Sequence, residues 1–400
     1  MTRRPRRVHQ LLPALLVVGL LTGCTSGAPA PGREQSSAPA AAASTRPTAT
    51  PTPSPTPTID ARATALVAAM STSERAGQLL MTAGTVAELP RLAATVRRYH
   101  LGGVMVRGRS SAGTAAVAKA LAPLQAAAPP DLPLLTATDQ EGGTVQVLSG
   151  PGFSAIPSAV QQGRGSAAST MRDAERWGRE LAKAGVRLDL APVADVPCAA
   201  TLYDNPPIAD LRRQYSSDPA AAGAHVAAFV QGMRAAGVAT TVKHFPGLGC
   251  VRENTDTVTH VLDTVTTVDS ARLRAFSAGI DAGPGFVMMS SAEYSRIDPG
   301  VPALFSSRIV HDLLRERLGF TGVVMSDDLG GAAAVKRWSP GQRAVRFVRA
   351  GGDLMLDIVP ADLAPMQRAM VQEASKDPRF AESLSTAAAR VVAARLRLAD

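Results

Sequence analysis

Short apolar runs alternate with longer amphipathic segments from position 59 to the end of the chain. The short runs have the length of buried strands, and the longer segments carry apolar residues at helical spacing. Eight strands are predicted, at 78–81, 103–106, 132–138, 188–196, 239–244, 286–290, 322–326 and 353–356. Helices are predicted at 85–99, 112–127, 168–184, 219–236, 271–280, 307–318 and 342–350, and Ser71 to Glu74 has the form of a capping box.

Strands that alternate with helices indicate a parallel sheet with helical crossovers. Eight such units in about 340 residues favour an α/β fold of the (β/α)8 barrel type over an open doubly wound sheet with a second domain. In such a barrel the functional side chains lie at the carboxyl ends of the strands. Three polar clusters directly follow apolar runs, namely DQEGG at 139–143, KHFPG at 243–247 and the pair Asp327-Asp328.

The amino-terminal 58 residues differ in composition from the rest of the chain. Residues 1–23 have the basic start, apolar stretch and small-residue site of an export signal, and the stretch is shorter than the roughly 20 residues a spanning helix needs. Residues 24–58 are almost entirely Ala, Pro, Ser, Thr and Gly, which predicts an extended tether before a single folded domain at 59–400. The ending LTGC at 21–24 resembles the bacterial lipobox, and this resemblance implies a lipoprotein acylated at Cys24 and held on the outer face of the cell membrane.

The charge balance gives no reason to predict a nucleic-acid partner. The chain has 42 Lys and Arg against 33 Asp and Glu, a formal net charge of +9. Four positive charges belong to the predicted signal and the tether adds one, which leaves +4 on the folded domain. The 4% of aromatic residues argues against a groove that stacks many rings.

No cofactor or metal is predicted. The chain has no phosphate-binding loop ending in Gly-Lys-Ser/Thr, no His-Glu-x-x-His and no Gly-x-Ser-x-Gly, and its six His are too few and too scattered for a zinc site. Apart from Cys24, only Cys198 and Cys250 remain. In an exported protein these two either form a disulfide, which would restrain the loop after KHFPG, or stay as free thiols.

Residue spacing alone leaves the chemistry of the polar clusters open. Asp327 and Asp328 are read as helix-capping residues, as a nucleophile or as metal ligands. Asp139 and Glu141 could ligate a metal, bind hydroxyls or make a turn. Lys243 draws attention because the chain has only five Lys against 37 Arg. Carboxylates that face a pocket beside Lys, His and Arg suit glycoside hydrolysis, which needs a carboxylate nucleophile and a proton donor.

These motifs, in this order, resemble those of family 3 glycoside hydrolases, particularly the single-barrel β-N-acetylhexosaminidases that act on cell-wall muropeptides. The resemblance runs from about 70 to 356 and also includes LAPVADV at 190–196, GFTGVVMSDDL at 319–329 and AGGD at 350–353. It implies that Asp327 is the nucleophile and that Asp139, Lys243 and His244 bind sugar hydroxyls. It further implies an arginine two residues before the stretch YSSDP at 215–219. Arg213 fits this spacing better than its neighbour Arg212.

The chain departs from the family pattern in the loop after KHFPG. That loop usually reads KHFPGHG and then presents an Asp-Ser-His dyad as the acid/base, whereas this chain has Leu248 and Asn254-Thr255-Asp256. Ser291 also stands where a histidine often follows the strand predicted at 286–290 in this family. Thr144 and Val147 stand where the family has basic residues after the glycine pair. We therefore predict that Asp256 serves as or supports the general acid/base, with Glu253 and His260 as alternatives. The other interpretation is that Asp256 only orders the loop.

Together these features predict an exported, lipid-anchored, retaining exo-glycosidase that removes terminal β-N-acetylglucosamine from peptidoglycan fragments. Its predicted partners are a carbohydrate substrate and, through the lipid anchor, the membrane, and it is expected to be a monomer. Two alternatives stay open. One is a β-glucosidase-type hydrolase of other β-glycosides, because no residue was found that reads the acetamido group, and the other is a catalytically silent sugar-binding lipoprotein.

Overall fold

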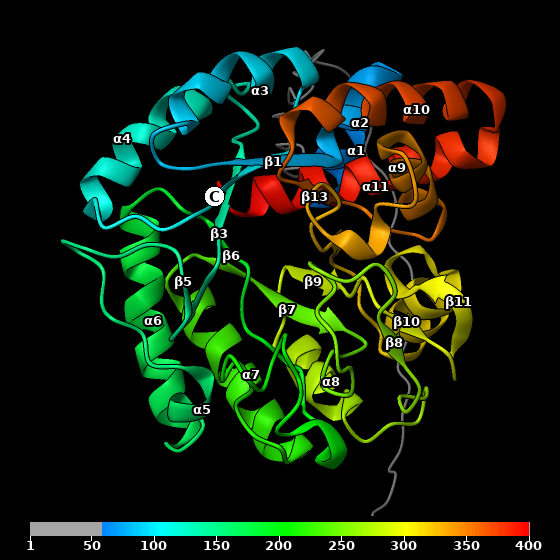
Figure 1. Ribbon diagram of the computed structural model, residues 1–400. Helices are drawn as coiled ribbons and strands as arrows, with labels where there is room; N and C mark the ends of the chain where they lie inside the picture. Colours follow the sequence, from blue (N-terminus) through cyan, green and yellow to red (C-terminus); the bar gives the residue numbers. More distant parts are fainter. Residues whose placement is uncertain (1–57, 400) are drawn as a thin grey trace, which may run out of the picture. The chain divides into compact units, whose positions relative to one another are not determined.

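Eight parallel strands form the centre of the computed structural model, which describes residues 58–399 (Figure 1). In chain order they are β1 (Leu80–Gly84), β2 (Gly103–Val106), β3 (Leu135–Thr138), β6 (Leu188–Asp189), β7 (Ala239–Phe245), β9 (Phe286–Met289), β12 (Val323–Ser326) and β13 (Met355–Asp357). From β1 to β12 each strand pairs in parallel with the next one, and β1 also pairs with β13. A bridge between Met325 and Leu354 joins β12 to the segment that leads into β13. The eight predicted strands and the (β/α)8 barrel are thus confirmed. The predicted export signal, most of the tether and Cys24 lie outside the described residues.

Helices surround this sheet, and every helix predicted from the sequence has a counterpart. The helices that follow the strands are α3 (Ala93–Tyr99), α4 (Gly113–Gln125), α6 (Ala167–Lys183), α7 (Pro219–Ala235), α8 (Leu273–Asp281), the π-type helix η4 (Arg308–Arg317), α9 (Pro340–Arg349), α10 (Leu363–Lys376) and α11 (Pro378–Arg397). Two more, α1 (Ile59–Ala69) and α2 (Thr72–Gln78), precede β1, and α2 begins with the predicted capping box of Ser71 and Glu74. The sequence patterns had not predicted α1, α10 or α11.

A proline accounts for the shortening of two predicted elements. The helix expected at 85–99 begins only at Ala93, because Pro90 lies in the preceding turn η1 (Leu89–Leu92). The strand expected at 188–196 pairs regularly only over β6, because Pro192 has no N–H to donate to a ladder. Val193 returns to the sheet in a single bridge with Lys243.

Two buried clusters make up the core. Alternate residues of the strands, such as Met81 and Ala83 of β1 and Met105 of β2, gather with residues of the other strands in an inner cluster. Their neighbours Leu80 and Val104 belong to the larger cluster between the sheet and the helices. This alternation is what a closed barrel requires, since successive side chains of a strand point to opposite faces.

The amino ends of the strands lie at what we call the basal end of the barrel. Here α1 packs beside α11, drawn blue and red in Figure 1. Asp60 of α1 and Arg397 of α11 line a basal hollow of about 880 Å³ together with residues that begin strands, such as Gly285 and Gly322. Within residues 58–399, no helix has both the length and the apolar character needed to cross a membrane.

Shorter elements build the opposite end. A two-stranded ribbon of β4 (Gln140–Gly142) and β5 (Val145–Gln146) follows β3, and a small sheet combines β8 (Leu262–Asp263), β10 (Glu293–Tyr294) and β11 (Asp298–Pro302). The remaining elements are α5 (Ala159–Gln162) and the turns η2 (Ala199–Thr201), η3 (Ala303–Phe305), η5 (Ala333–Val335) and η6 (Pro360–Asp362). Most of these short elements lie in the loops that follow the strands and surround the site described next.

Candidate active site

A pocket of about 510 Å³ opens at the carboxyl ends of the strands. Six residues singled out from the sequence all line it: Asp139, Arg213, Lys243, His244, Asp256 and Asp327. Lys243 and His244 lie near the end of β7, and the other four lie in the segments that follow β3, β6, β7 and β12. The barrel topology thus brings together residues as much as 188 positions apart in the chain. This end of the barrel is where the predicted fold locates chemistry.

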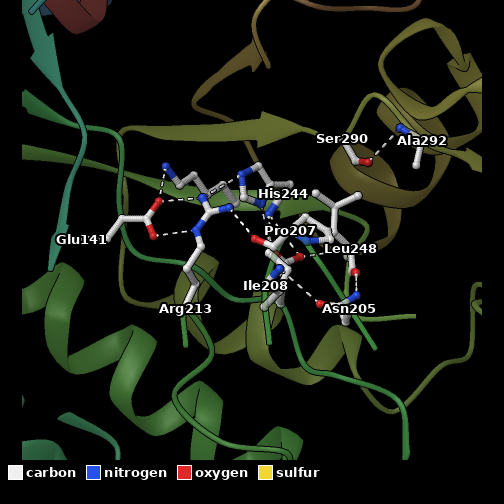
Figure 2. A network of polar contacts seen from close by, with 12 residues as sticks. Glu141, Asn205, Pro207, Ile208, Arg213, His244, Leu248, Ser290 and Ala292 are labelled. Atoms are coloured by element: carbon white, nitrogen blue, oxygen red, sulfur yellow. Dashed lines mark hydrogen bonds and ion pairs between the residues drawn. The ribbon is translucent and has the colours of Figure 1, made fainter. Parts of the chain in front are cut away.

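Glu141 is the hub of a buried ion network in this pocket (Figure 2). Arg213 donates two parallel hydrogen bonds to it, from Nε to Oε2 over 2.8 Å and from Nη2 to Oε1 over 2.7 Å. Lys243 Nζ lies 2.7 Å from the same Oε1 and donates to Asp139 Oδ1 over 2.6 Å. The forked Arg–carboxylate pair fixes the guanidinium orientation. The network therefore holds Lys243 and Arg213 rigidly at one wall of the pocket.

The pKa shifts in this network follow from burial and charge. Burial alone would raise the pKa of Glu141, but the charges of Arg213 and Lys243 and their hydrogen bonds lower it to about 2. Burial likewise opposes the charge on Lys243, yet Asp139 and Glu141 raise its pKa to about 12. Glu141 and Lys243 therefore stay charged at neutral pH.

The turn after Glu141 depends on two glycines. Gly142 and Gly143 have φ values of 104° and 59°, a region that other residues rarely adopt. A Cβ atom on Gly142 would lie 2.3 Å from the carbonyl oxygen of Pro157. The DQEGG motif thus serves a structural purpose as well: its glycines allow the tight turn that directs Asp139 and Glu141 toward Lys243.

Asp195 orients His244. Its Oδ2 lies 2.7 Å from His244 Nδ1, and its Oδ1 accepts a hydrogen bond of 2.7 Å from the backbone N–H of Leu248. Asp195 is fully buried, so this carboxylate selects the tautomer in which Nδ1 carries the proton. The other ring nitrogen, Nε2, then faces Arg213 Nη2 at 3.4 Å and is available at the pocket wall.

Asp189 lies below this wall, buried on β6. Its Oδ1 accepts a hydrogen bond of 3.0 Å from the backbone N–H of Gln140, whereas its Oδ2 has no partner among the described residues. Burial raises the pKa of Asp189 to about 8, which means that this carboxyl is largely protonated at neutral pH. It holds the strand of Asp139 and Glu141 from beneath without adding a further negative charge.

Asp327 lies where β12 ends, half-buried in the pocket. Its Oδ1 accepts a hydrogen bond of 2.8 Å from the backbone N–H of Asp328. Burial raises its pKa to about 6, and the charge of Asp256 adds to this shift. Asp327 is therefore mostly ionised at neutral pH and close enough to Asp256 for the two charges to interact.

Asp256 lies at the mouth of the same pocket, exposed to solvent, on the segment 246–261, which we call the β7 loop. Its backbone N–H donates to Asn254 Oδ1 over 2.9 Å. Among the described residues, no hydrogen bond reaches its carboxylate. Glu253 and His260, the alternatives for the acid/base, do not line the pocket, and His260 Nε2 lies 3.2 Å from Glu293 Oε2 instead.

A disulfide between Cys198 and Cys250 ties the β7 loop to the segment after β6. The same two segments are joined by Asn205, whose Nδ2 donates to the carbonyl oxygens of Leu248 and Val251 over 2.9 and 2.7 Å. These contacts hold the first half of the β7 loop. The sequence had left open whether the two cysteines pair.

Two residues of the site had no role assigned from the sequence: Asp195 behind His244 and Asp189 below it. Glu141 had been considered as a metal ligand, a hydroxyl ligand or a turn residue, and not as the hub of an ion network. Glu141 and Asp195 stand inside recognised motifs, so their position was a usable signal. Asp189 is a single acid within an apolar run, and such a position indicates a polar residue that is buried with a hydrogen-bond partner. Arg212, the second candidate for the arginine, is exposed with a φ of 58° and is absent from the pocket lining, whereas Arg213 lines it.

Within residues 58–399, no three His, Cys, Asp or Glu side chains are gathered in a way that could hold a metal ion. The carboxylates of Asp139 and Glu141 are instead paired with Lys243 and Arg213. The arrangement offers one carboxylate at the pocket floor, a second at its mouth, and a wall of fixed donors and acceptors. Such a set can hold a polyhydroxylated ring and act on a bond at its edge.

Comparisons with known proteins agree with this geometry. Residues 71–394 match the glycosyl hydrolase family 3 N terminal domain. The chain is 40% identical over 243 residues to a beta-hexosaminidase of Xylella fastidiosa, covering 58% of this chain and 68% of that protein. It is 36% identical over 277 residues to a beta-hexosaminidase of Xanthomonas campestris pv. campestris, covering 67% and 80%. The crystal structure of a beta-N-acetylhexosaminidase from Beutenbergia cavernae superposes with a TM-score of 0.79 at 47% identity, covering 82% of this chain and 98% of that one.

Proposed function

Because the chain belongs to glycosyl hydrolase family 3, we propose that it removes terminal β-N-acetylglucosamine from cell-wall fragments with retention of configuration. The chain is a glycoside hydrolase, and its likeness to beta-hexosaminidases and to a beta-N-acetylhexosaminidase structure supports this sugar. The observation that carries the mechanism is that Asp327 and Asp256 share one pocket beside the wall of Lys243, His244 and Arg213.

In the first step Asp327 acts as the nucleophile and Asp256 as the acid. One carboxylate oxygen of Asp327 attacks the anomeric carbon and forms a glycosyl ester, while the bond to the leaving oxygen breaks. The Asp256 carboxyl gives a proton to that oxygen, and the aglycone departs as an alcohol. The charge on Asp327 is consumed in the new bond, and the negative charge appears on Asp256.

In the second step water replaces Asp327. The Asp256 carboxylate takes a proton from the water as it attacks the anomeric carbon from the side that the aglycone left. The ester bond breaks, and Asp327 leaves as a carboxylate. Two displacements at the same carbon restore the original configuration, and both acids return to their starting states.

The pocket wall fixes the terminal sugar ring. Asp139, Lys243, His244 and Arg213 supply charged or strongly polar groups on one side, and their mutual ion pairs keep them in place before substrate arrives. Hydrogen bonds from charged groups to sugar hydroxyls are stronger than those between neutral groups. A pocket of this kind suits removal of a terminal residue rather than cleavage inside a chain.

A panel of aryl glycosides tests the proposal. Wild-type protein is expected to hydrolyse the β-N-acetylglucosaminide in preference to the β-glucoside, and Asp327→Asn is expected to be inactive. Preference for the glucoside would instead identify a β-glucosidase-type enzyme, and binding without turnover would identify a sugar-binding protein. Proton NMR of the first product formed distinguishes the anomers: early release of the α-anomer would rule out the retaining mechanism.

We extend the proposal to location: acylation of Cys24 anchors the domain to the outer face of the membrane, where cell-wall fragments are available. The support is the LTGC ending and the tether composition. The full chain should appear in the membrane fraction with a lipid-modified Cys24. Substitution Cys24→Ala should abolish the lipid label, and an unlabelled Cys24 in the wild-type chain would show that the location is wrong.

A further inference from the structure

The second half of the β7 loop, which carries Asp256, is held by two other loops. The backbone N–H groups of Ala333 and Ala334, in the loop after β12, donate to the carbonyl oxygens of Asp256 and Thr255 over 3.2 and 3.1 Å. The backbone N–H of Glu293, after β9, donates to the carbonyl oxygen of Val261 over 2.9 Å. The three loops thus meet directly behind the proposed acid/base.

Glu293 joins the same three loops through its side chain. Its Oε1 accepts from Arg337 Nη2 over 2.8 Å, and its Oε2 lies 3.2 Å from His260 Nε2. His260 ends the β7 loop, Glu293 begins β10, and Arg337 follows η5. We call these three residues the Glu293 cluster. The side chain of Glu293 is 7% exposed, whereas those of Arg337 and His260 are 45% and 57% exposed.

A buried carboxylate is stable only when its oxygens are paired, so Glu293 draws both partners toward it. Arg337 is further fixed because its guanidinium stacks over the ring of Trp338, 4.0 Å from the centroid. Trp338 in turn packs edge-on against Phe305, with 5.1 Å between ring centroids. One arm of the Glu293 cluster is therefore anchored in an aromatic pair.

We propose that Glu293 is a positioning residue for proton transfer: the Glu293 cluster fixes the β7 loop so that Asp256 is held at the glycosidic oxygen. No member of the cluster lines the pocket, so its effect on the reaction passes through the loop and not through substrate. The inference rests on the proposed role of Asp256. Misplacing a catalytic group by about 1 Å can cost on the order of 10²-fold in rate, so a loosened loop has a measurable cost.

The leaving group provides a readout that general loss of structure does not share. A dinitrophenolate departs without protonation, whereas unsubstituted phenol needs a proton from the enzyme. Values of kcat/KM report the first step only. A defect in proton donation therefore lowers kcat/KM for phenyl β-N-acetylglucosaminide and spares the dinitrophenyl glycoside, and a general loss of structure lowers both.

Four variants of the full chain are compared with wild type on the two substrates. Asp256→Asn should lose about 10²-fold or more on the phenyl glycoside. Glu293→Leu should lose about tenfold and Arg337→Gln about threefold on that substrate, with changes of less than about twofold on the dinitrophenyl glycoside. Glu293→Gln, which retains one acceptor, should fall between wild type and Glu293→Leu.

Arg317→Gln is the matched control. Arg317 is 49% exposed, close to the 45% of Arg337, and its Nη2 lies 2.7 Å from Oδ1 of the exposed Asp269, which is not a buried carboxylate partner of the Glu293 kind. Its substitution should leave both substrates unaffected. Because Arg337 is at the surface, Arg337→Gln keeps the test informative if Glu293→Leu does not fold.

The outcomes separate the inference from the proposed function. If Asp256→Asn discriminates between the substrates but the Glu293 and Arg337 variants lose nothing, or lose equally on both, Glu293 is not a positioning residue. If Asp256→Asn itself does not discriminate, the acid/base role of Asp256 is wrong and the inference falls with it. Discrimination by all three kinds of variant supports both.

Discussion

Asp327 and Asp328 are consecutive in the chain, yet their carboxylates are used differently. Asp328 accepts backbone hydrogen bonds from Gly330 and Ile358 on Oδ1 and from Gly331 on Oδ2, over 2.8 to 3.1 Å. Asp327 accepts one such bond, on Oδ1, and its Oδ2 has no hydrogen-bond partner among the described residues. The first acid is thus available to a substrate, while the second shapes the loop that presents it.

This contrast predicts different results for the same substitution at the two positions. Asp327→Asn removes the proposed nucleophile and should lower kcat by at least about 10³-fold, with little effect on the free energy of unfolding. Asp328→Asn loses an acceptor for Gly331 and should lower the free energy of unfolding by about 1–2 kcal/mol, with a much smaller effect on kcat. Urea unfolding and steady-state kinetics measure both. Equal loss of kcat in the two variants would contradict the assignment.

Azide should reveal the second role of Asp256. In Asp256→Gly no carboxylate activates water, so the glycosyl-enzyme formed from the dinitrophenyl glycoside should accumulate. Azide is a small anion that needs no base, and it should restore turnover and yield the β-glycosyl azide. Mass spectrometry and NMR identify the product. Wild type, in which Asp256 repels anions, is the control; absence of the azide product in the variant would count against a base at this position.

Activity should fall as the pH drops through about 6. The pKa of Asp327 is raised to about 6 by burial, with a smaller contribution from the charge of Asp256, and only the ionised form attacks. Below this pH, kcat/KM should decline about tenfold per unit. Asp256→Asn removes one source of the raised pKa, so the acid limb should move to lower pH. An acid limb unchanged in this variant would mean that the two carboxyls do not interact.

The Glu141 network should make stability depend on acid. The folded-state pKa of Glu141 is about 2, below its ordinary value of 4.5. Its contribution is therefore complete above about pH 4.5 and is lost as the pH falls toward 2. Glu141→Gln leaves Lys243 and Arg213 with less compensation and should lower the free energy of unfolding at pH 7 by about 3 kcal/mol. Between about pH 4.5 and pH 2, the free energy of unfolding of Glu141→Gln should also change less than that of wild type.

Loss of the disulfide should affect both stability and catalysis. The bridge closes a loop of 52 residues, and removing such a constraint costs about 3 kcal/mol. The double variant Cys198→Ser/Cys250→Ser should unfold at lower urea concentration. Because the β7 loop loses one support, kcat should fall more than KM rises. Reducing agent should have the same effect on wild type and none on the variant, and two titratable thiols in oxidised wild type would contradict the bridge.

The barrel was predictable because each strand is a short apolar run followed by a break in pattern. A parallel strand is buried on both faces, so nearly all of its residues are apolar and the run is visible in the sequence. The first and last residues of the helices and strands were harder to predict. Pro192 and Pro90 have no backbone N–H to donate, which shortens β6 and α3, and the hydrophobic pattern carries no signal for this loss.

The site was predictable only as far as its residues stand in motifs. Asp139 and Asp327 directly follow strands, Lys243 and His244 lie at the end of one, and the barrel topology then brings all four into one pocket. Residue spacing could not separate Asp327 from Asp328, because the difference lies in which backbone N–H groups point at each. Glu293 could not be found either, since its partners lie 33 and 44 positions away in other loops.

Thr58 caps α1 at the basal end, where the strands begin, whereas Asp327 and Asp256 stand where the strands finish. The amino-terminal junction and the mouth of the pocket therefore face opposite ways. A bead, a surface or a fusion partner attached directly at Thr58 lies at the end of the barrel opposite the pocket, and a bulky insoluble substrate can still approach the pocket. The same cargo inserted at Tyr203, which is 92% exposed, lies instead in the segment that the disulfide ties to the β7 loop.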